Sequence, residues 1–98
     1  MKIRKRKDPE NREPVDSNQE MVRDALFETI RTQIRTNDPP ETASTLDRLL
    51  GDGHSEEEAM RLIGCALSVE VFEVMKHGRP FDPARYRRNL ERLPTMPS

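Results

Sequence analysis

The sequence predicts an all-α protein, a small four-helix bundle with one long helix and a disordered basic N-terminal tail. Three observations predict this fold. Apolar residues recur at steps of three and four along four segments, which is the period of one face of an α-helix. Ser, Asp, Pro and Gly stand at the ends of these segments, where helix caps are expected. No segment alternates between apolar and polar residues as a strand does.

The chain is short and poor in apolar residues. Its 98 residues are 33% apolar, 36% charged and 4% aromatic, and there is no Trp. A typical globular domain is roughly 45–50% apolar. Length and composition therefore allow one small domain with a thin core, and they exclude a large enclosed active site. A tail, a partner chain or both are expected.

Three regions are distinguished by composition. Residues 1–16 carry basic residues and then Asp, Glu and Pro, with almost no apolar side chains to bury. Burial therefore cannot offset the conformational entropy that the segment would lose on ordering. We expect them to form a disordered basic tail. Residues 17–94 form the predicted helical domain, and residues 95–98 form a disordered C-terminus.

The helical domain divides into four predicted helices, over residues 18–36, 39–50, 56–77 and 83–93. The first helix has a capping-box spacing between Ser17 and Glu20. Its apolar stripe consists of Met21, Val22, Ala25, Leu26, Ile30 and Ile34. Asp38 is expected to cap the second helix, with Pro39 at its first position. The predicted apolar face of the second helix consists of Ala43, Leu46, Leu49 and Leu50.

The third helix is expected to begin after the capping residue Ser55 and to end at Gly78, because Gly favours the left-handed conformation at a helix C-terminus. Its inward face is predicted to consist of Ala59, Met60, Ile63, Ala66, Leu67, Val71, Val74 and Met75. Asp82 and Pro83 are expected to begin the fourth helix. Phe81 is placed to pack on Tyr86 as a hydrophobic staple. The fourth helix buries Leu90 and Leu93. Its predicted end is at Pro94.

The charges are unevenly distributed although the net charge is only −1. Residues 38–75 carry nine acidic and two basic groups, whereas residues 76–98 carry six basic and two acidic groups. Residues 1–18 are also basic, with a surplus of two positive charges. Opposite patches of this kind can pair between subunits or attract a charged partner.

The single cysteine and the short apolar runs indicate the cellular compartment of the protein. Cys65 is the only cysteine and lies in an apolar stretch, so a buried, unreactive thiol is expected. The basic start is not followed by the apolar segment of a signal peptide. No apolar run approaches the ~20 residues of a membrane span. The sequence therefore predicts a cytoplasmic protein without membrane contact.

Candidate catalytic and metal-binding residues are few. His54 and His77 are the only histidines, and neither follows a Glu at the spacing of a helical di-metal site. Glu28 and Glu70 stand at the borders of their apolar stripes and are expected to reach water, Arg31 or an Arg across a subunit interface. No phosphate-binding loop or nucleophile motif occurs. We therefore expect no enzyme activity, no metal and no cofactor.

The length of the third helix suggests how the protein acts. It is nearly twice as long as the second and fourth helices, so part of its apolar stripe stays uncovered, and a homodimer that joins the long helices would cover it. The first functional hypothesis is therefore protein association by helices. The predicted partner-binding residues are Met60, Ile63, Gly64, Leu67, Val71 and Val74.

The alternative hypothesis is binding to nucleic acid by basic residues of the tail and of the fourth helix. These residues are Lys2, Arg4, Lys5, Arg6, Lys7, Arg85, Arg87 and Arg88. Such clusters can contact phosphates without sequence preference. The tail has no interleaved aromatic residue to stack on bases. A helix-turn-helix over residues 43–63 is disfavoured because its recognition helix would begin with three Glu.

Several short motifs follow one another in a characteristic order: Asn37-Asp38-Pro39-Pro40-Glu41, Glu58-Ala59, Ile63-Gly64 and Gly78-Arg79-Pro80-Phe81-Asp82. With these motifs, residues 25–94 resemble a family of short bacterial all-helical proteins known only as a domain of unknown function. The resemblance implies the helical fold. Members carry a His-Glu-Ala-x-His run that could hold a metal, but Glu57 and Arg61 replace its two histidines here. The resemblance thus implies a degenerate member of a metal-binding family as a second alternative.

Overall fold

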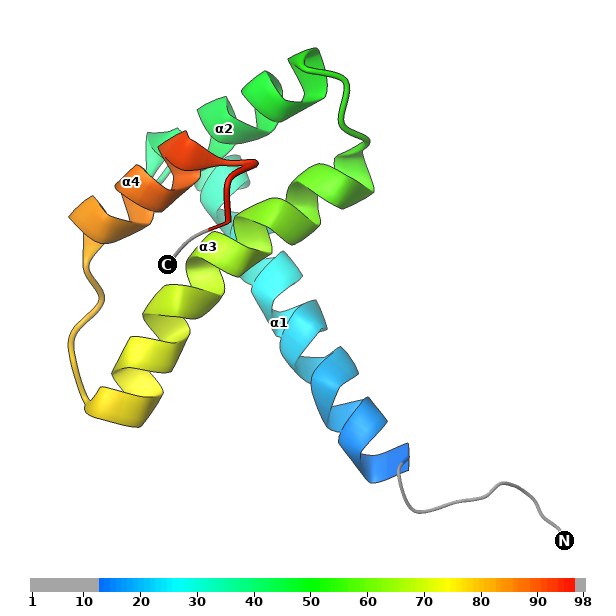
Figure 1. Cartoon of the computed structure of the whole chain (residues 1–98), viewed down its shortest axis with the longest axis vertical. Helices are drawn as coiled ribbons and strands as arrows, with labels where there is room; N and C mark the ends of the chain where they lie inside the picture. The colour runs from blue at the N-terminus through cyan, green and yellow to red at the C-terminus, as the bar shows by residue number, and fades with distance from the viewer. Residues whose placement is uncertain (1–12, 97–98) are drawn as a thin grey trace, which may run out of the picture.

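The computed structural model describes residues 13–96, with side chains from residue 20 onward. The predicted tail residues 1–12 and the last residues 97–98 lie outside the described part. Within residues 13–96 all regular structure is helical, which confirms the predicted all-α bundle. The four helices in Figure 1 are α1 (Glu13–Thr36), α2 (Pro40–Gly51), α3 (Glu56–His77) and α4 (Pro83–Arg92).

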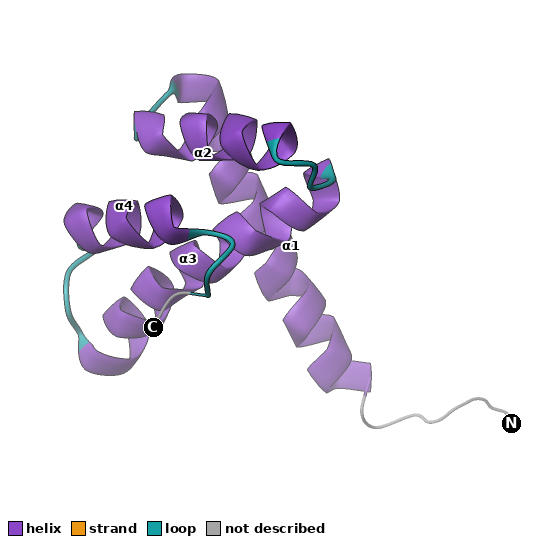
Figure 2. Cartoon of the chain, turned by 45° about the horizontal axis from the view of Figure 1, so that its top comes forward, coloured by secondary structure: helices purple, strands orange, loops and turns teal. Residues whose placement is uncertain are grey.

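Helices α1 and α3 cross, and the two shorter helices pack around this crossing. Helix α3 contacts each of the other three helices, and α2 also contacts α1 and α4. Figures 1 and 2 show that the N-terminal half of α1 and the C-terminal half of α3 diverge below the crossing. The ends of these two halves extend beyond the part of the molecule where α2 and α4 pack.

Helix α1 begins earlier than predicted, at Glu13 rather than at residue 18. Ser17 therefore lies inside the helix and is not its N-cap, and the last four residues of the predicted tail are helical. Pro14 is compatible with this start, because the first turn of a helix does not need the N–H group that Pro lacks.

The N-terminus of α2 differs from the prediction by one residue. Pro39 occupies the N-cap position without a side-chain hydrogen bond, and Pro40 is the first helical residue, so Asp38 is not the cap. Asn37 has a positive φ of 55° and ends α1. Asn tolerates this left-handed conformation better than most residues. The chain therefore leaves α1 at Asn37, and α2 begins one residue later than an Asp38 cap would require.

The ends of α3 and α4 confirm the predicted caps. The Ser55 hydroxyl accepts a hydrogen bond from the Glu58 backbone N–H at 3.0 Å, and Gly78 ends α3 with a φ of 64°. The Asp82 carboxylate accepts from two backbone N–H groups of α4. The rings of Phe81 and Tyr86 pack edge to face with centroids 5.7 Å apart, as expected for the staple.

The core lies where the four helices meet. Its buried members are Ile30, Leu49, Ala59, Met60, Ile63, Ala66, Leu67, Tyr86, Leu90 and Leu93. The predicted face of α2 is partly wrong, because Leu50 is 41% exposed whereas Thr42 and Thr45 are buried. Helix α2 is rotated so that its threonines, rather than Leu50, face the other helices.

A hydrogen-bonded network explains this rotation of α2. The Gln33 side-chain oxygen of α1 accepts from the Thr42 hydroxyl at 2.8 Å and from the Tyr86 hydroxyl at 2.9 Å. The two hydroxyls lie 3.4 Å apart. Since each buried polar group needs a partner, this arrangement fixes α1, α2 and α4 relative to one another.

We predict that Tyr86, the only Tyr of the chain, ionises above its ordinary pKa. Burial raises the pKa of Tyr86, and the hydrogen bonds with Thr42 and Gln33 only partly oppose this shift. The folded protein therefore keeps the phenol proton at a pH where the unfolded chain has lost it. Stability should be intact below pH ~10 and should fall as pH rises through the raised pKa.

The near-ultraviolet absorbance of phenolate measures this ionisation directly. A midpoint at the ordinary Tyr value in the folded protein would contradict the prediction. In the Tyr86→Phe variant the loss of stability at alkaline pH should become smaller. The variant should also lose about 1 kcal/mol at neutral pH, because the hydroxyl donates to Gln33.

Candidate association surface

The α3 residues predicted to face a partner fall into two groups. Met60, Ile63 and Leu67 are at most 6% exposed, and Gly64 is also buried. These four belong to the core of the chain itself, so the prediction that they bind a partner is wrong. Val71 and Val74 are 38% and 43% exposed, and only they remain accessible.

The crossing of α1 explains why the first group is buried. A Cβ atom at Gly64 would lie 3.7 Å from the Phe27 ring and 4.0 Å from Ile30 Cδ1. The absence of a side chain at Gly64 thus lets α1 pack closely on α3. The helix that crosses α3 closely belongs to the same chain.

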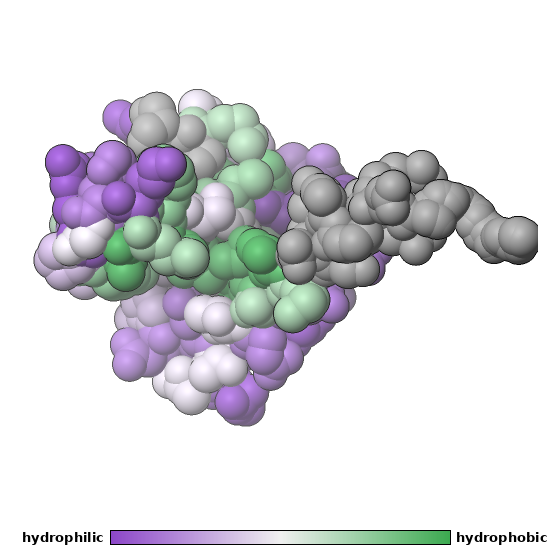
Figure 3. Space-filling view, turned by 90° about the horizontal axis from the view of Figure 1, so that it is seen from below, coloured by the Kyte–Doolittle hydropathy of each residue, from purple (hydrophilic) through white to green (hydrophobic). Residues whose placement is uncertain are grey.

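The last turns of α3 carry four exposed large apolar side chains. We call it the α3 end; its members are Val71, Phe72, Val74 and Met75. Phe72 and Met75 are 53% and 80% exposed. Figure 3 views the molecule from below and shows apolar residues gathered in a band across this part of the surface. Contiguous apolar area of this kind marks interaction sites.

The N-terminal half of α1 adds further exposed apolar residues. Met21 and Val22 are 68% and 58% exposed. The sequence placed them in the inward stripe of the first helix, and that prediction is wrong because α1 extends beyond the helices that could cover it. Both diverging halves below the crossing therefore present apolar side chains to solvent.

The charges of α3 have opposite signs at its two ends. Glu56, Glu57 and Glu58 form the first turn, and Lys76 and His77 lie in the last turn. Acidic groups at the N-terminus and basic groups at the C-terminus stabilise a helix through its dipole. They also give the outer face of α3 an acidic end and a basic end.

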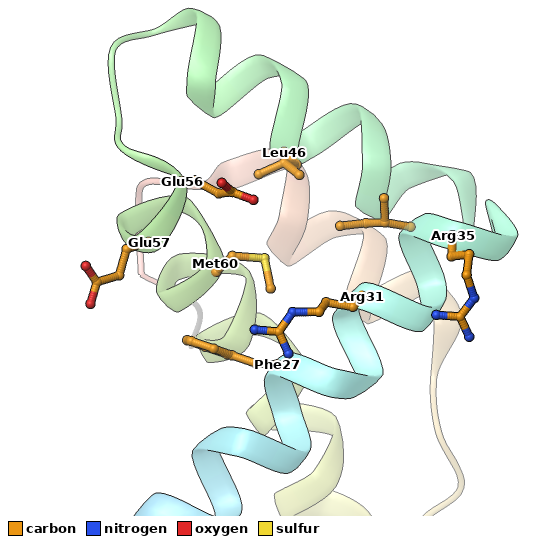
Figure 4. Close-up of a pocket in the computed structure, with 8 residues that line it drawn as sticks. Phe27, Arg31, Arg35, Leu46, Glu56, Glu57 and Met60 are labelled. Atoms are coloured by element: carbon orange, nitrogen blue, oxygen red, sulfur yellow. The ribbon is translucent and has the colours of Figure 1, made fainter.

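A pocket of about 530 Å³ lies between α1, α2 and the start of α3. Figure 4 shows its apolar walls, which include Phe27, Leu46 and Met60, with Arg31 and Glu56 pointing across them. The Arg31 guanidinium carbon lies 6.0 Å from the centre of the Phe27 ring, a cation–π distance. The volume is that of a small-molecule site, but its charged rim is exposed.

A buried ion pair fastens α4 to α3. The Glu70 side chain is fully buried, and it accepts from Arg85 Nε at 2.6 Å, from Arg85 Nη2 at 3.0 Å and from the Asp82 N–H at 2.9 Å. The hydrogen bond to Glu70 is the main reason that the pKa of Arg85 is raised. The sequence placed Glu70 at a stripe border and left open whether it reaches water, Arg31 or an Arg across an interface, so the pairing with Arg85 was not predicted. The structure shows an Arg of the same chain.

The structure does not bring the other candidate acid–base and metal-binding residues into one site. Glu28 is exposed on α1 beside Arg31, away from the buried pair of Glu70. His54 Nδ1 lies 3.1 Å from Glu58, and the His77 ring packs edge to face on Phe72. Among residues 20–96, whose side chains the structure describes, no group of three His, Cys, Asp or Glu is arranged to hold a metal.

The basic residues predicted to bind nucleic acid are only partly accessible. Arg85 is held by Glu70 and is not free to contact a phosphate. Arg87, Arg88 and Arg92 are exposed on α4. Lys2, Arg4, Lys5, Arg6 and Lys7 lie outside the described residues.

Comparison with protein-family models, curated proteins and solved structures finds no match for this chain. The resemblance to the short bacterial helical family therefore stays a prediction. Within the described residues no helix is long and apolar enough to cross a bilayer. The association surface is thus interpreted from its own geometry.

We predict that Glu70→Gln lowers the free energy of unfolding by about 2 kcal/mol, because a buried hydrogen-bonded charge is lost. Glu73→Gln is the matched control on the same helix. Glu73 also pairs with an Arg, at 3.3 Å, but the Arg79 side chain of this pair is 65% exposed. The control should change stability by less than about 0.5 kcal/mol. Urea denaturation measures both values, and equal losses would contradict the assignment.

Proposed function

We propose that this chain is a non-enzymatic association domain of the cytoplasm that forms a homodimer through α3. The observation that carries the proposal is the exposed α3 end, where the Phe72 side chain is 53% exposed in the single chain. Covering such side chains is favourable, at roughly 25 cal/mol per Å² of apolar surface. A second copy is the simplest partner, because it presents the same surface and closes the assembly by two-fold symmetry.

Two further features support association rather than catalysis. The most buried carboxylate, Glu70, is satisfied by Arg85 and by a backbone N–H, so it holds α4 in place. The other candidate carboxylate, Glu28, is exposed and lies on a different helix. The proposal places the protein in a reducing compartment, where Cys65 stays a thiol.

Phe72→Glu should weaken the dimer at least tenfold, because it replaces an exposed apolar side chain of α3 with a charge that must be desolvated on association. Phe72 is 53% exposed, so the folded monomer should tolerate the change. Sedimentation velocity over a range of protein concentrations measures the monomer–dimer equilibrium. Circular dichroism of the same samples verifies that the helices remain.

Met21→Glu is the matched control, since Met21 is 68% exposed but lies on α1. It should leave the dimer intact if α3 forms the interface. A wild-type chain that stays monomeric up to about 100 μM, where even weak complexes associate, would overturn the proposed function. Equal weakening by both variants would show that α3 is not the specific interface.

A second candidate function is nucleic-acid binding, favoured by the three exposed arginines of α4. Arg87, Arg88 and Arg92 lie within six residues and make this short helix strongly basic. Contacts of this kind are made to phosphates, are independent of sequence and weaken with salt. The tail residues 2–7 could contribute in the same way.

The double variant Arg87→Glu/Arg88→Glu should reduce any binding to a short DNA or RNA duplex at low salt by at least about tenfold, because two phosphate contacts change sign. Fluorescence anisotropy at several salt concentrations measures the affinity. Glu91→Gln is the control on the same helix and should not weaken binding. If the wild-type chain does not bind at low salt, this candidate is excluded.

A further inference from the structure

A line of residues with heptad spacing runs along the outer face of α3. Leu62, Cys65, Val69 and Phe72 follow one another at steps of three, four and three. This spacing places them on one side of the helix, as in a coiled-coil seam. Leu62, Cys65 and Val69 are partly exposed and Phe72 is 53% exposed, so the line is most accessible at Phe72. The line lies beside the core face of α3, and its first residue, Leu62, also packs against the core.

Opposite charges extend this line by one step at each end. Glu58 precedes Leu62 by four residues, and Lys76 follows Phe72 by four residues. Both are exposed. The outer line therefore begins with an acid, continues through apolar side chains and ends with a base, and its spacing is the same from either end.

We infer that α3 packs antiparallel against α3 of a second copy, about a two-fold axis beside Leu67. The equal spacing from both ends makes the outer line self-complementary, as such an axis requires. Glu58 then lies opposite the partner's Lys76, Leu62 opposite the partner's Phe72, and Cys65 opposite the partner's Val69. The small Cys65 near the axis lets the two helices approach closely.

Charge selects the antiparallel arrangement over the parallel one. In a parallel pair Glu58 would face a second Glu58, and the neighbouring Glu56 and Glu57 would add to the repulsion. In the antiparallel pair each acidic end meets Lys76 and His77 of the partner, and the two helix dipoles oppose each other. Each dimer has two such ends, so the preference acts twice.

This inference rests on the proposed homodimer, and single-cysteine cross-linking tests it. In a Cys65→Ser background, Glu58→Cys and Lys76→Cys chains are prepared, one with an additional tag so that a mixed pair is larger. The two positions are 18 residues apart, about 27 Å along a helix. The antiparallel pair brings only unlike positions within disulfide range, so mixing the chains in a glutathione buffer should yield the mixed disulfide and little of either like pair.

Met75→Cys is the matched control for Lys76→Cys. Met75 is the preceding residue and is 80% exposed, but it lies about 100° around the helix, off the outer line. Its disulfide with Glu58→Cys should form at least about fivefold less, because the side chains point apart. Equal yields, or a dominant disulfide between two Lys76→Cys chains, would overturn the antiparallel pairing.

Charge reversal supplies an independent measurement without cysteines. Glu58→Lys and Lys76→Glu should each weaken the dimer in sedimentation velocity, and the double variant should restore it, because opposite charges face each other again. Additive weakening in the double variant would overturn the pairing. A dimer that forms with the wrong cross-links refutes only this arrangement, whereas a monomer at every concentration refutes the proposed function itself.

Discussion

The structure depends on a mismatch in length between α3 and the helices that pack against it. Helix α3 has 22 residues, whereas α2 has 12 and α4 has 10. Helix α1 is long enough, but it crosses α3 at Gly64 and then diverges. The chain therefore buries the inward residues in the first half of α3, such as Ala59, Met60 and Ile63, and leaves apolar residues of the second half exposed. The proposed homodimer depends on these exposed residues in the second half of α3.

The small apolar core is supplemented by polar groups that satisfy one another. Glu70 and Arg85 hold α4 on α3, and the Gln33, Thr42 and Tyr86 side chains join three helices. A chain with 33% apolar residues cannot rely on burial alone. Directional contacts of this kind fix the positions of short helices, because an unpaired buried group is costly. The polar interior is thus part of what orders the fold.

Much of the fold could be predicted from local signals, and the least local features could not. Ser55, Gly78 and Asp82 mark helix ends by interactions within a few residues, and all three act as predicted. The error at Asp38 arose because two consecutive prolines fit two neighbouring helix starts, and the structure uses the second, with Pro39 at the N-cap position. The burial of Thr42 in place of Leu50 depends on partners 9 and 44 residues away in sequence. No pattern within α2 signals those partners.

The sequence by itself determined that four helices form, where α3 begins and ends, where α4 begins, and that α3 is too long for its neighbours, because caps and apolar periodicity act over one or two turns. Only the tertiary structure decided which part of α3 remains exposed. That depends on where α1 crosses, which is a matter of packing between residues distant in sequence. It moved the candidate surface from Met60 and Ile63 to the last turns of α3. It also showed that Glu70 forms a buried ion pair within the chain, because its partner Arg85 comes close only when α4 packs against α3.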